Sequence, residues 1–95
     1  MSIGTVLDKQ GDHPRALEHH QRALAKYEAA GAGETSDAAT CLMSIGSVHL
    51  NQGDFPRALE HYQRALAKFE AAGAGETPDA AKCLMSIGSV HFHQG

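Results

Sequence analysis

Apolar residues recur at intervals of three and four positions along most of the chain. Between residues 36 and 51, Leu42, Ile45, Gly46 and His49 fall on one face of a helix. Between residues 54 and 72 the apolar face is broader and is formed by Ala58, Leu59, Tyr62, Ala65, Leu66 and Phe69. This period predicts amphipathic helices, and no stretch shows the alternation typical of a strand. We expect five helices, at about 1–9, 12–30, 36–51, 54–72 and 78–93.

Residues typical of helix ends flank these segments. Thr77 is suited to cap the helix that starts at Pro78, and Asp54 is suited to cap the helix at 54–72. Gly53 can adopt the left-handed conformation that ends the preceding helix. Together with the period, these signals place the chain in the all-α class.

The chain repeats itself with a period of 42 residues. Residues 2–43 align with 44–85 without a gap, and nine of the 42 positions differ, so that 33 are identical. A third copy, 86–95, matches 44–53 at eight of ten positions. A fixed period of this length predicts a solenoid of stacked helix pairs. We therefore expect a single domain, 1–95, with about two and a quarter repeats.

Small and aromatic residues stand at set positions of each unit, which in the second copy are Ile45, Gly46, Gly53, Ala58, Tyr62 and Ala65. This pattern resembles the tetratricopeptide repeat, although the ordinary repeat of that family has about 34 residues. The eight extra residues would lengthen each helix by about one turn of 3.6 residues. The resemblance implies a right-handed superhelix of antiparallel helical hairpins.

Long repeats of this kind resemble those of kinesin light chains. The likeness rests on the stretch 62–66, followed by Gly75 and by Pro78-Asp79-Ala80-Ala81. Kinesin light chains place asparagines where Met43 and Ser44 stand, and those asparagines help to hold peptide backbones. The cargo preference of the light chains therefore does not carry over to this chain.

The resemblance also implies that the first helices of successive repeats line a concave groove that receives peptides. The groove stripe, offset from the buried face, would consist of Thr40, Met43, Ser47, Leu50 and Asn51. Its counterpart in the third copy is Lys82, Met85, Ser89, Phe92 and His93, and in the first copy Met1, Thr5, Asp8 and Lys9.

Differences between the copies concentrate on this stripe. Between the first two units, four of the five groove pairs differ, against five of the other 37 pairs. Between the second and third copies the two differences are Leu50/Phe92 and Asn51/His93. Free drift of exposed positions is the alternative explanation, although exposed second-helix residues such as Glu60 are unchanged between copies. The pattern favours a stripe that recognises a ligand.

The chemistry of the stripe is mixed, with Met, Leu and Phe beside Ser, Asn and one Lys. Methionine adapts to irregular apolar ligands, and Lys82 alone cannot hold a terminal carboxylate as several cationic residues do in some relatives. We expect a protein-interaction module, a scaffold or adaptor, that binds an amphipathic helix or an extended segment with apolar anchors.

A second hypothesis is structural. The helix at about 78–93 is expected to lack a partner helix, and such solenoids normally need about three repeats. We therefore expect either a fragment of a longer array or a chain that self-associates through open ends, with Leu84 and Ile87 in the contact. Such a module would serve as a spacer that stacks into dimers or filaments.

Composition limits the other classes of function. The net charge of −3 argues against a nucleic-acid binder, and no run of about 18 apolar residues predicts a membrane span. The first residues lack the pattern of a signal peptide, so a cytoplasmic location is expected.

Cys41 and Cys83 lie at equivalent positions of stacked repeats, about 10 Å apart, which is too far for a disulfide. We expect both to be small core residues in a reducing compartment.

No set of residues predicts catalysis, a metal or a cofactor. The loop 73–77 lacks the Gly-Lys-Ser/Thr ending of a phosphate-binding loop. No Cys or carboxylate completes a ligand set with the histidines, and we expect His49 and His91 to be partly buried, hydrogen-bonded imidazoles. The second helices also carry a basic stripe, which comprises Arg57, His61, Arg64 and Lys68. This stripe is either a binding surface for an acidic partner or, as we favour, a solvated outer face.

Overall fold

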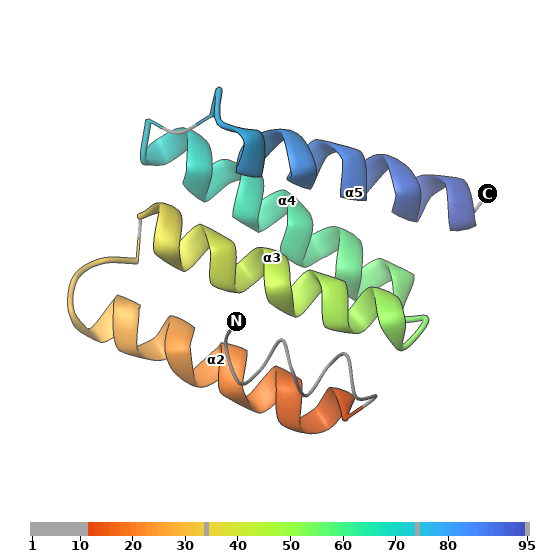
Figure 1. The fold of residues 1–95 in the computed structure, drawn as a ribbon, viewed down its shortest axis with the longest axis horizontal. Helices are drawn as coiled ribbons and strands as arrows, with labels where there is room; N and C mark the ends of the chain where they lie inside the picture. The colour runs from red at the N-terminus through yellow and green to blue at the C-terminus, as the bar shows by residue number, and fades with distance from the viewer. Residues whose placement is uncertain (1–11, 34, 74, 95) are drawn as a thin grey trace.

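The computed structural model describes residues 12–33, 35–73 and 75–94, with the backbone alone for His93 and Gln94. This part of the chain forms four α-helices, α2 (His13–Ala29), α3 (Ser36–Asn51), α4 (Phe55–Ala71) and α5 (Pro78–Gln94), stacked in antiparallel order (Figure 1). The expected helix boundaries are confirmed to within one residue. The expected helix at 1–9 and the groove residues assigned to it lie outside the described residues.

The helix ends form as their residues predict. The Thr35 hydroxyl accepts a hydrogen bond from the Ala38 amide at 3.3 Å, and the Asp54 carboxylate accepts one from the Arg57 amide at 3.4 Å. These caps satisfy amides that have no partner within the first turn. Gly53 ends α3 with a φ of 78°, a conformation that costs little only for glycine.

The core lies between the stacked helices, with α3, α4 and α5 supplying most of it and Leu24 of α2 in the same cluster. It contains Leu42, Ile45, Ala65, Phe69 and Cys83, all essentially without solvent exposure. The predicted buried face of the 36–51 helix is confirmed, and four of the six positions predicted for the 54–72 helix are buried; the other two, Leu59 and Leu66, are half-buried.

Gly46 is the point of closest approach between α3 and α4. A Cβ at this position would lie 3.0 Å from two ring carbons of Tyr62 and 3.3 Å from the carbonyl oxygen of Ala58. The Tyr62 hydroxyl is in turn 2.9 Å from the Ser47 hydroxyl, which holds the ring in place. Glycine at position 46 therefore allows the two helices to pack around a buried aromatic ring.

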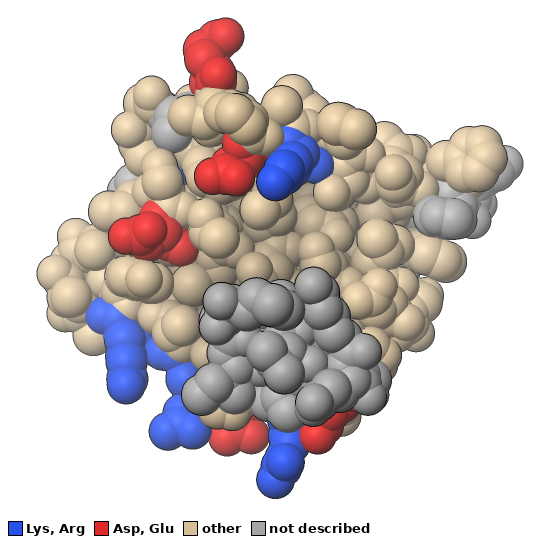
Figure 2. Space-filling view, viewed as in Figure 1, with Lys and Arg blue, Asp and Glu red and all other residues tan. Residues whose placement is uncertain are grey.

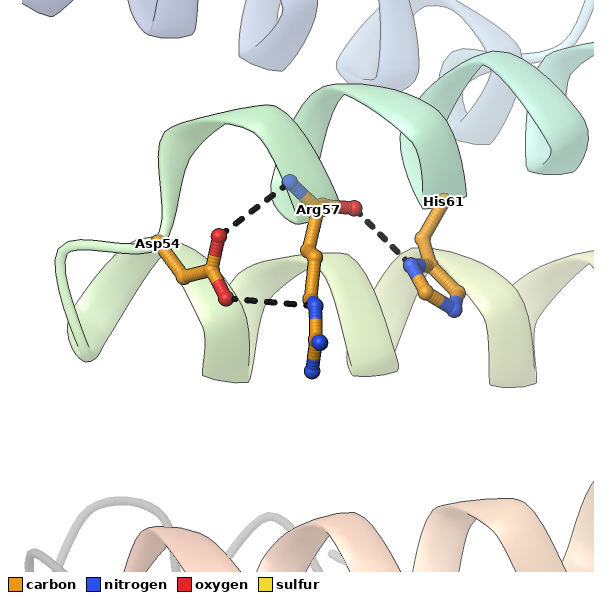
Figure 3. A network of polar contacts seen from close by, with 3 residues as sticks. All are labelled: Asp54, Arg57 and His61. Carbon is orange, nitrogen blue, oxygen red and sulfur yellow. Dashed lines mark hydrogen bonds and ion pairs between the residues drawn. The ribbon is translucent and has the colours of Figure 1, made fainter.

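His49 meets the expectation of a buried imidazole in part, since Gln52 hydrogen-bonds to its side chain but one ring nitrogen has no partner. It is buried, its Nδ1 has no hydrogen-bond partner, and its ring centroid lies 5.1 Å from that of His61. His61 is oriented by the Arg57 carbonyl oxygen, 2.8 Å from its Nδ1, and the Arg57 side chain pairs with Asp54 at 3.5 Å (Figure 3). Burial lowers the pKa of His49 most, and the positive charges of His61 and Arg57 lower it further. The negative charge of Asp54 and a hydrogen bond from Gln52 raise it, with smaller effect than burial.

The lowered pKa of His49 makes stability depend on pH. The unfolded chain binds the proton more readily than the fold does, so stability decreases as the pH falls below the ordinary histidine pKa of about 6.5. We expect the Tm to fall by several degrees between about pH 7.5 and about pH 5.5. His49→Leu, which introduces the residue found at the equivalent position 7, should flatten this profile in thermal unfolding followed by circular dichroism.

His91 provides the matched control for this prediction, because it occupies the same repeat position on α5 but is exposed. His91→Leu should leave the slope of Tm against pH as it is in the wild type. Equal slopes for His49→Leu and the wild type would show that another group causes the pH dependence.

Candidate peptide-binding groove

A pocket of about 370 Å³ opens between α3 and α5. It is lined by Met43, Ser47, Lys82, Met85, Ser86 and Ser89. Over α3 and α5 the face seen in Figure 2 consists largely of uncharged side chains, and Lys and Arg side chains gather along the lower edge of the view, at α2. Among the six residues that line the pocket, Lys82 alone is charged.

The structure brings together half of the groove residues predicted in the second and third copies. Five of the ten line this pocket, namely Met43, Ser47, Lys82, Met85 and Ser89. Thr40 lines a separate hollow between α2 and α3. Leu50 packs into the core beside α4, and Asn51 and Phe92 are exposed outside the pocket. The side chain of His93 lies outside the described residues.

Met43 has two roles in the structure. It lines the pocket, and it is also half-buried against both clusters of core side chains, one around Phe69 and the other around Tyr62. Met85, its counterpart on α5, is 73% exposed. A charged residue at position 43 would therefore disturb the core, whereas one at position 85 would change the groove alone.

Ser86 lines the pocket but was not predicted to do so. It is serine in all three copies, as Ser2 and Ser44 show, so the comparison between copies gave no signal. Helix geometry could have found it, because Lys82, Met85, Ser86 and Ser89 have the spacing i, i+3, i+4, i+7 of one face.

The pocket is lined by two methionines, three serines and one lysine. Met43 and Met85 offer flexible apolar surface, and the Ser47 hydroxyl is already engaged with Tyr62 at 2.9 Å and with the Met43 carbonyl oxygen at 3.2 Å. Lys82 supplies a positive charge from an exposed position. Such a site can hold an apolar side chain and pair with an acceptor beside it.

The outer, basic stripe is partly occupied by interactions within the chain. Arg57 pairs with Asp54, and on α2 the Arg22 guanidinium lies 3.6 Å from the Glu18 carboxylate. Glu18 and Arg22 have the i, i+4 spacing at which opposite charges pair on a helix. These exposed pairs agree with a solvated outer face.

Both cysteines are free thiols, but their environments differ. Cys83 is buried and Cys41 is half-buried, so the expectation of two core residues holds fully for Cys83 alone. Burial, aided by the charge of Asp79, raises the pKa of Cys83 to about 11, and burial with Asp37 raises the pKa of Cys41. Both stay protonated at neutral pH, the form least suited to nucleophilic attack or metal binding.

The described helices thus form stacked antiparallel hairpins with a pocket between successive first helices, an arrangement typical of helical repeat proteins. A model of the tetratricopeptide repeat matches residues 1–71 and again residues 37–95, so the chain belongs to the tetratricopeptide repeat family. Repeats of this family generally mediate protein interactions and are typically non-catalytic.

No curated protein sequence and no solved structure matches the chain significantly. None of the helices in the described residues is long and apolar enough to cross a lipid bilayer.

Proposed function

We propose that the chain is an adaptor or scaffold module that binds a segment of a partner protein in the groove between α3 and α5. The observation that carries this proposal is the pocket itself, in which Met43 and Met85 lie together with a single charged residue, Lys82. Residues 1–95 act as one domain in this proposal, with repeats at 2–43, 44–85 and 86–95.

The lining of the pocket limits the chemistry of the ligand. Two methionines favour an apolar anchor residue, and Lys82 favours an acidic side chain or a carbonyl group beside that anchor. A single lysine does not form the cluster of cations that a terminal carboxylate requires. The segment is therefore an internal amphipathic helix or an extended stretch of the partner.

The proposal includes a likeness to the kinesin light chain type of repeat, supported by the period of 42 residues. The cargo differs, because Met43 and Ser44 replace the asparagines of the light chains. A cytoplasmic location belongs to the same proposal and is supported by the two free thiols at equivalent repeat positions.

Binding can be tested with a displayed library of short random peptides selected against the full chain. The affinity of the enriched peptide is then measured by fluorescence anisotropy. Met85→Glu should weaken binding at least about tenfold, because it places a charge in the apolar part of the pocket. Lys82→Met should select against peptides that carry an acidic residue beside their apolar anchor.

Gln63→Glu is the matched control, since it adds the same charge at an exposed position of α4 away from the pocket. This variant should bind the peptide as the wild type does. Selection that enriches no peptide, or an affinity that Met85→Glu leaves unchanged, contradicts the proposal.

A further inference from the structure

Two histidine rings from different helices pack against each other between α3 and α4. The His49 ring centroid lies 5.1 Å from that of His61, with an angle of 33° between the ring planes. Neutral imidazoles can pack at this distance. A proton on each ring would instead bring two positive charges together beside a buried side chain, where repulsion is stronger than in water.

Neither ring is free to turn away from a charged neighbour. Only 6% of His49 is exposed, and Gln52 hydrogen-bonds to its side chain. The charged form of a histidine carries an N–H on both ring nitrogens, so protonated His49 would have a buried donor at Nδ1, which has no partner. His61 is held by the Arg57 carbonyl oxygen, 2.8 Å from its Nδ1 (Figure 3). Repulsion between the rings therefore acts on the two helices.

The charged groups around the pair do not neutralise it. Arg57 adds a positive charge from α4, and Asp54, in the turn before α4, is the one acidic residue that acts on His49 within the described residues. The Asp54 carboxylate is already engaged, since it pairs with the Arg57 side chain at 3.5 Å and accepts the Arg57 amide at 3.4 Å. In the described part of α2 and α5, no titratable group acts on His49. The protonated pair is therefore a repulsive contact.

The same parts of α3 and α4 support one wall of the pocket. Tyr62 follows His61 on α4, and its hydroxyl lies 2.9 Å from the hydroxyl of Ser47, which lines the pocket. Tyr62 also belongs to the core cluster against which Met43, a second lining residue, is packed. A movement of α4 at His61 would therefore withdraw Tyr62 from both residues of the wall.

We propose that the His49–His61 pair is a pH-sensitive contact that regulates the groove. At about pH 7 and above, the rings are uncharged and α4 supports the pocket wall; below about pH 6, protonation separates this part of α4 from α3 and weakens the binding of an apolar anchor. The sign follows from the packed contact, which favours neutral His49, so that protonation favours the separated form. The separation rests on the ring pair alone, whereas its effect on a ligand rests on the proposed function.

Hydrogen–deuterium exchange of the full chain measures the separation without a ligand. Exchange rates at about pH 7.5 and about pH 5.5 are divided by the intrinsic rate at each pH, well below the Tm, to give the protection of each amide. Helices of this length are marginal without packing. Protection around the ring pair, in residues 45–50 of α3 and 58–64 of α4, should therefore fall at least about threefold at the lower pH, while that of α2 stays unchanged.

Three variants identify the group that responds to pH. His49→Leu, which introduces the residue found at the equivalent position 7, should abolish the loss of protection. His61→Phe keeps a ring beside His49 but removes its charge, so it should reduce the loss. His91→Leu is the matched control at the same repeat position, in an exposed residue, and should lose protection as the wild type does.

The effect on the groove is measured by fluorescence anisotropy with the peptide from the binding experiment, in a version without histidine. Acidic side chains of the peptide stay ionised between about pH 7.5 and about pH 5.5, so its own charge changes little. The wild type should bind it at least about fivefold more weakly at the lower pH. His49→Leu should bind it equally at both.

Four results would overturn the proposal. The first is unchanged protection around the ring pair at the lower pH, and the second is an equal loss in α2, which means unfolding of the whole chain. The third is a loss in His49→Leu as large as in the wild type. The fourth is an unchanged affinity although protection falls, in which case peptide binding itself stands. Failure to select any peptide contradicts the proposed function instead, and the exchange experiment then decides the separation by itself.

Discussion

Leu42→Ala is expected to lower the free energy of unfolding by about 2–5 kcal/mol, because it removes a fully buried side chain and leaves a cavity. A loss of this size is a large part of the about 5–15 kcal/mol that stabilises a typical domain. Leu84→Ala changes the same residue in the same repeat position of α5, where the leucine is 56% exposed. There we expect a loss below about 1 kcal/mol.

Denaturant unfolding, followed by circular dichroism at a concentration where the chain is monomeric, measures both changes. The two variants share their local sequence, so helix propensity cancels and the difference reports the presence of α4 over Leu42. Equal losses would mean that the two leucines have the same surroundings in solution, which contradicts the exposure of Leu84.

The helices could be predicted from the sequence because their signals are local. The period of the apolar residues, the cap at Asp54 and the glycine at position 53 each act within one or two turns. For this reason the boundaries of all four described helices agree with the prediction to within one residue.

Burial could not be predicted in the same way, because it depends on which neighbour a repeat position meets. Leu42 and Leu84 have the same local sequence and opposite exposures, and Cys41 and Cys83 differ for the same reason. His49 was expected to be hydrogen-bonded, and its Nδ1 has no partner although Gln52 bonds to the same side chain, because the group that packs beside the ring is the ring of His61.

The candidate groove was predictable only in part. Helical spacing placed Met85, Lys82 and Ser89 on one stripe, and the structure brings them into one pocket with residues of α3. The predicted stripe includes residues that do not line the pocket, since Leu50 packs against the core beside α4. Residues on one face of a helix line a pocket only where a second helix lies beside them. The sequence of one helix does not show where that neighbouring helix lies.

Gly46→Ala and Gly88→Ala are expected to change stability in opposite directions. At position 46 the new methyl group would meet the Tyr62 ring at 3.0 Å and the backbone of Ala58 at 3.3 Å. Overpacking of this kind costs about 1–3 kcal/mol, against a gain of about 0.5–1 kcal/mol from replacing a helical glycine. We expect a net loss of about 1–2 kcal/mol.

The new methyl group at position 88 would meet nothing within 4 Å. The gain in helix propensity is therefore not offset by a steric clash. Gly88→Ala should therefore stabilise the monomer by up to about 1 kcal/mol in the same unfolding experiment. Stabilisation by both substitutions would show that Tyr62 moves aside at little cost.

The origin of the loss at position 46 can be traced with a double-mutant cycle. Tyr62 is 1% exposed and its hydroxyl is held by Ser47, so the ring has little room to yield to the methyl group. In a Tyr62→Leu background the ring is absent, and Gly46→Ala should then cost less than it does in the wild type. An unchanged cost would assign the effect to the contact with the Ala58 backbone, and the close approach of α3 and α4 would then depend on their main chains rather than on the buried ring.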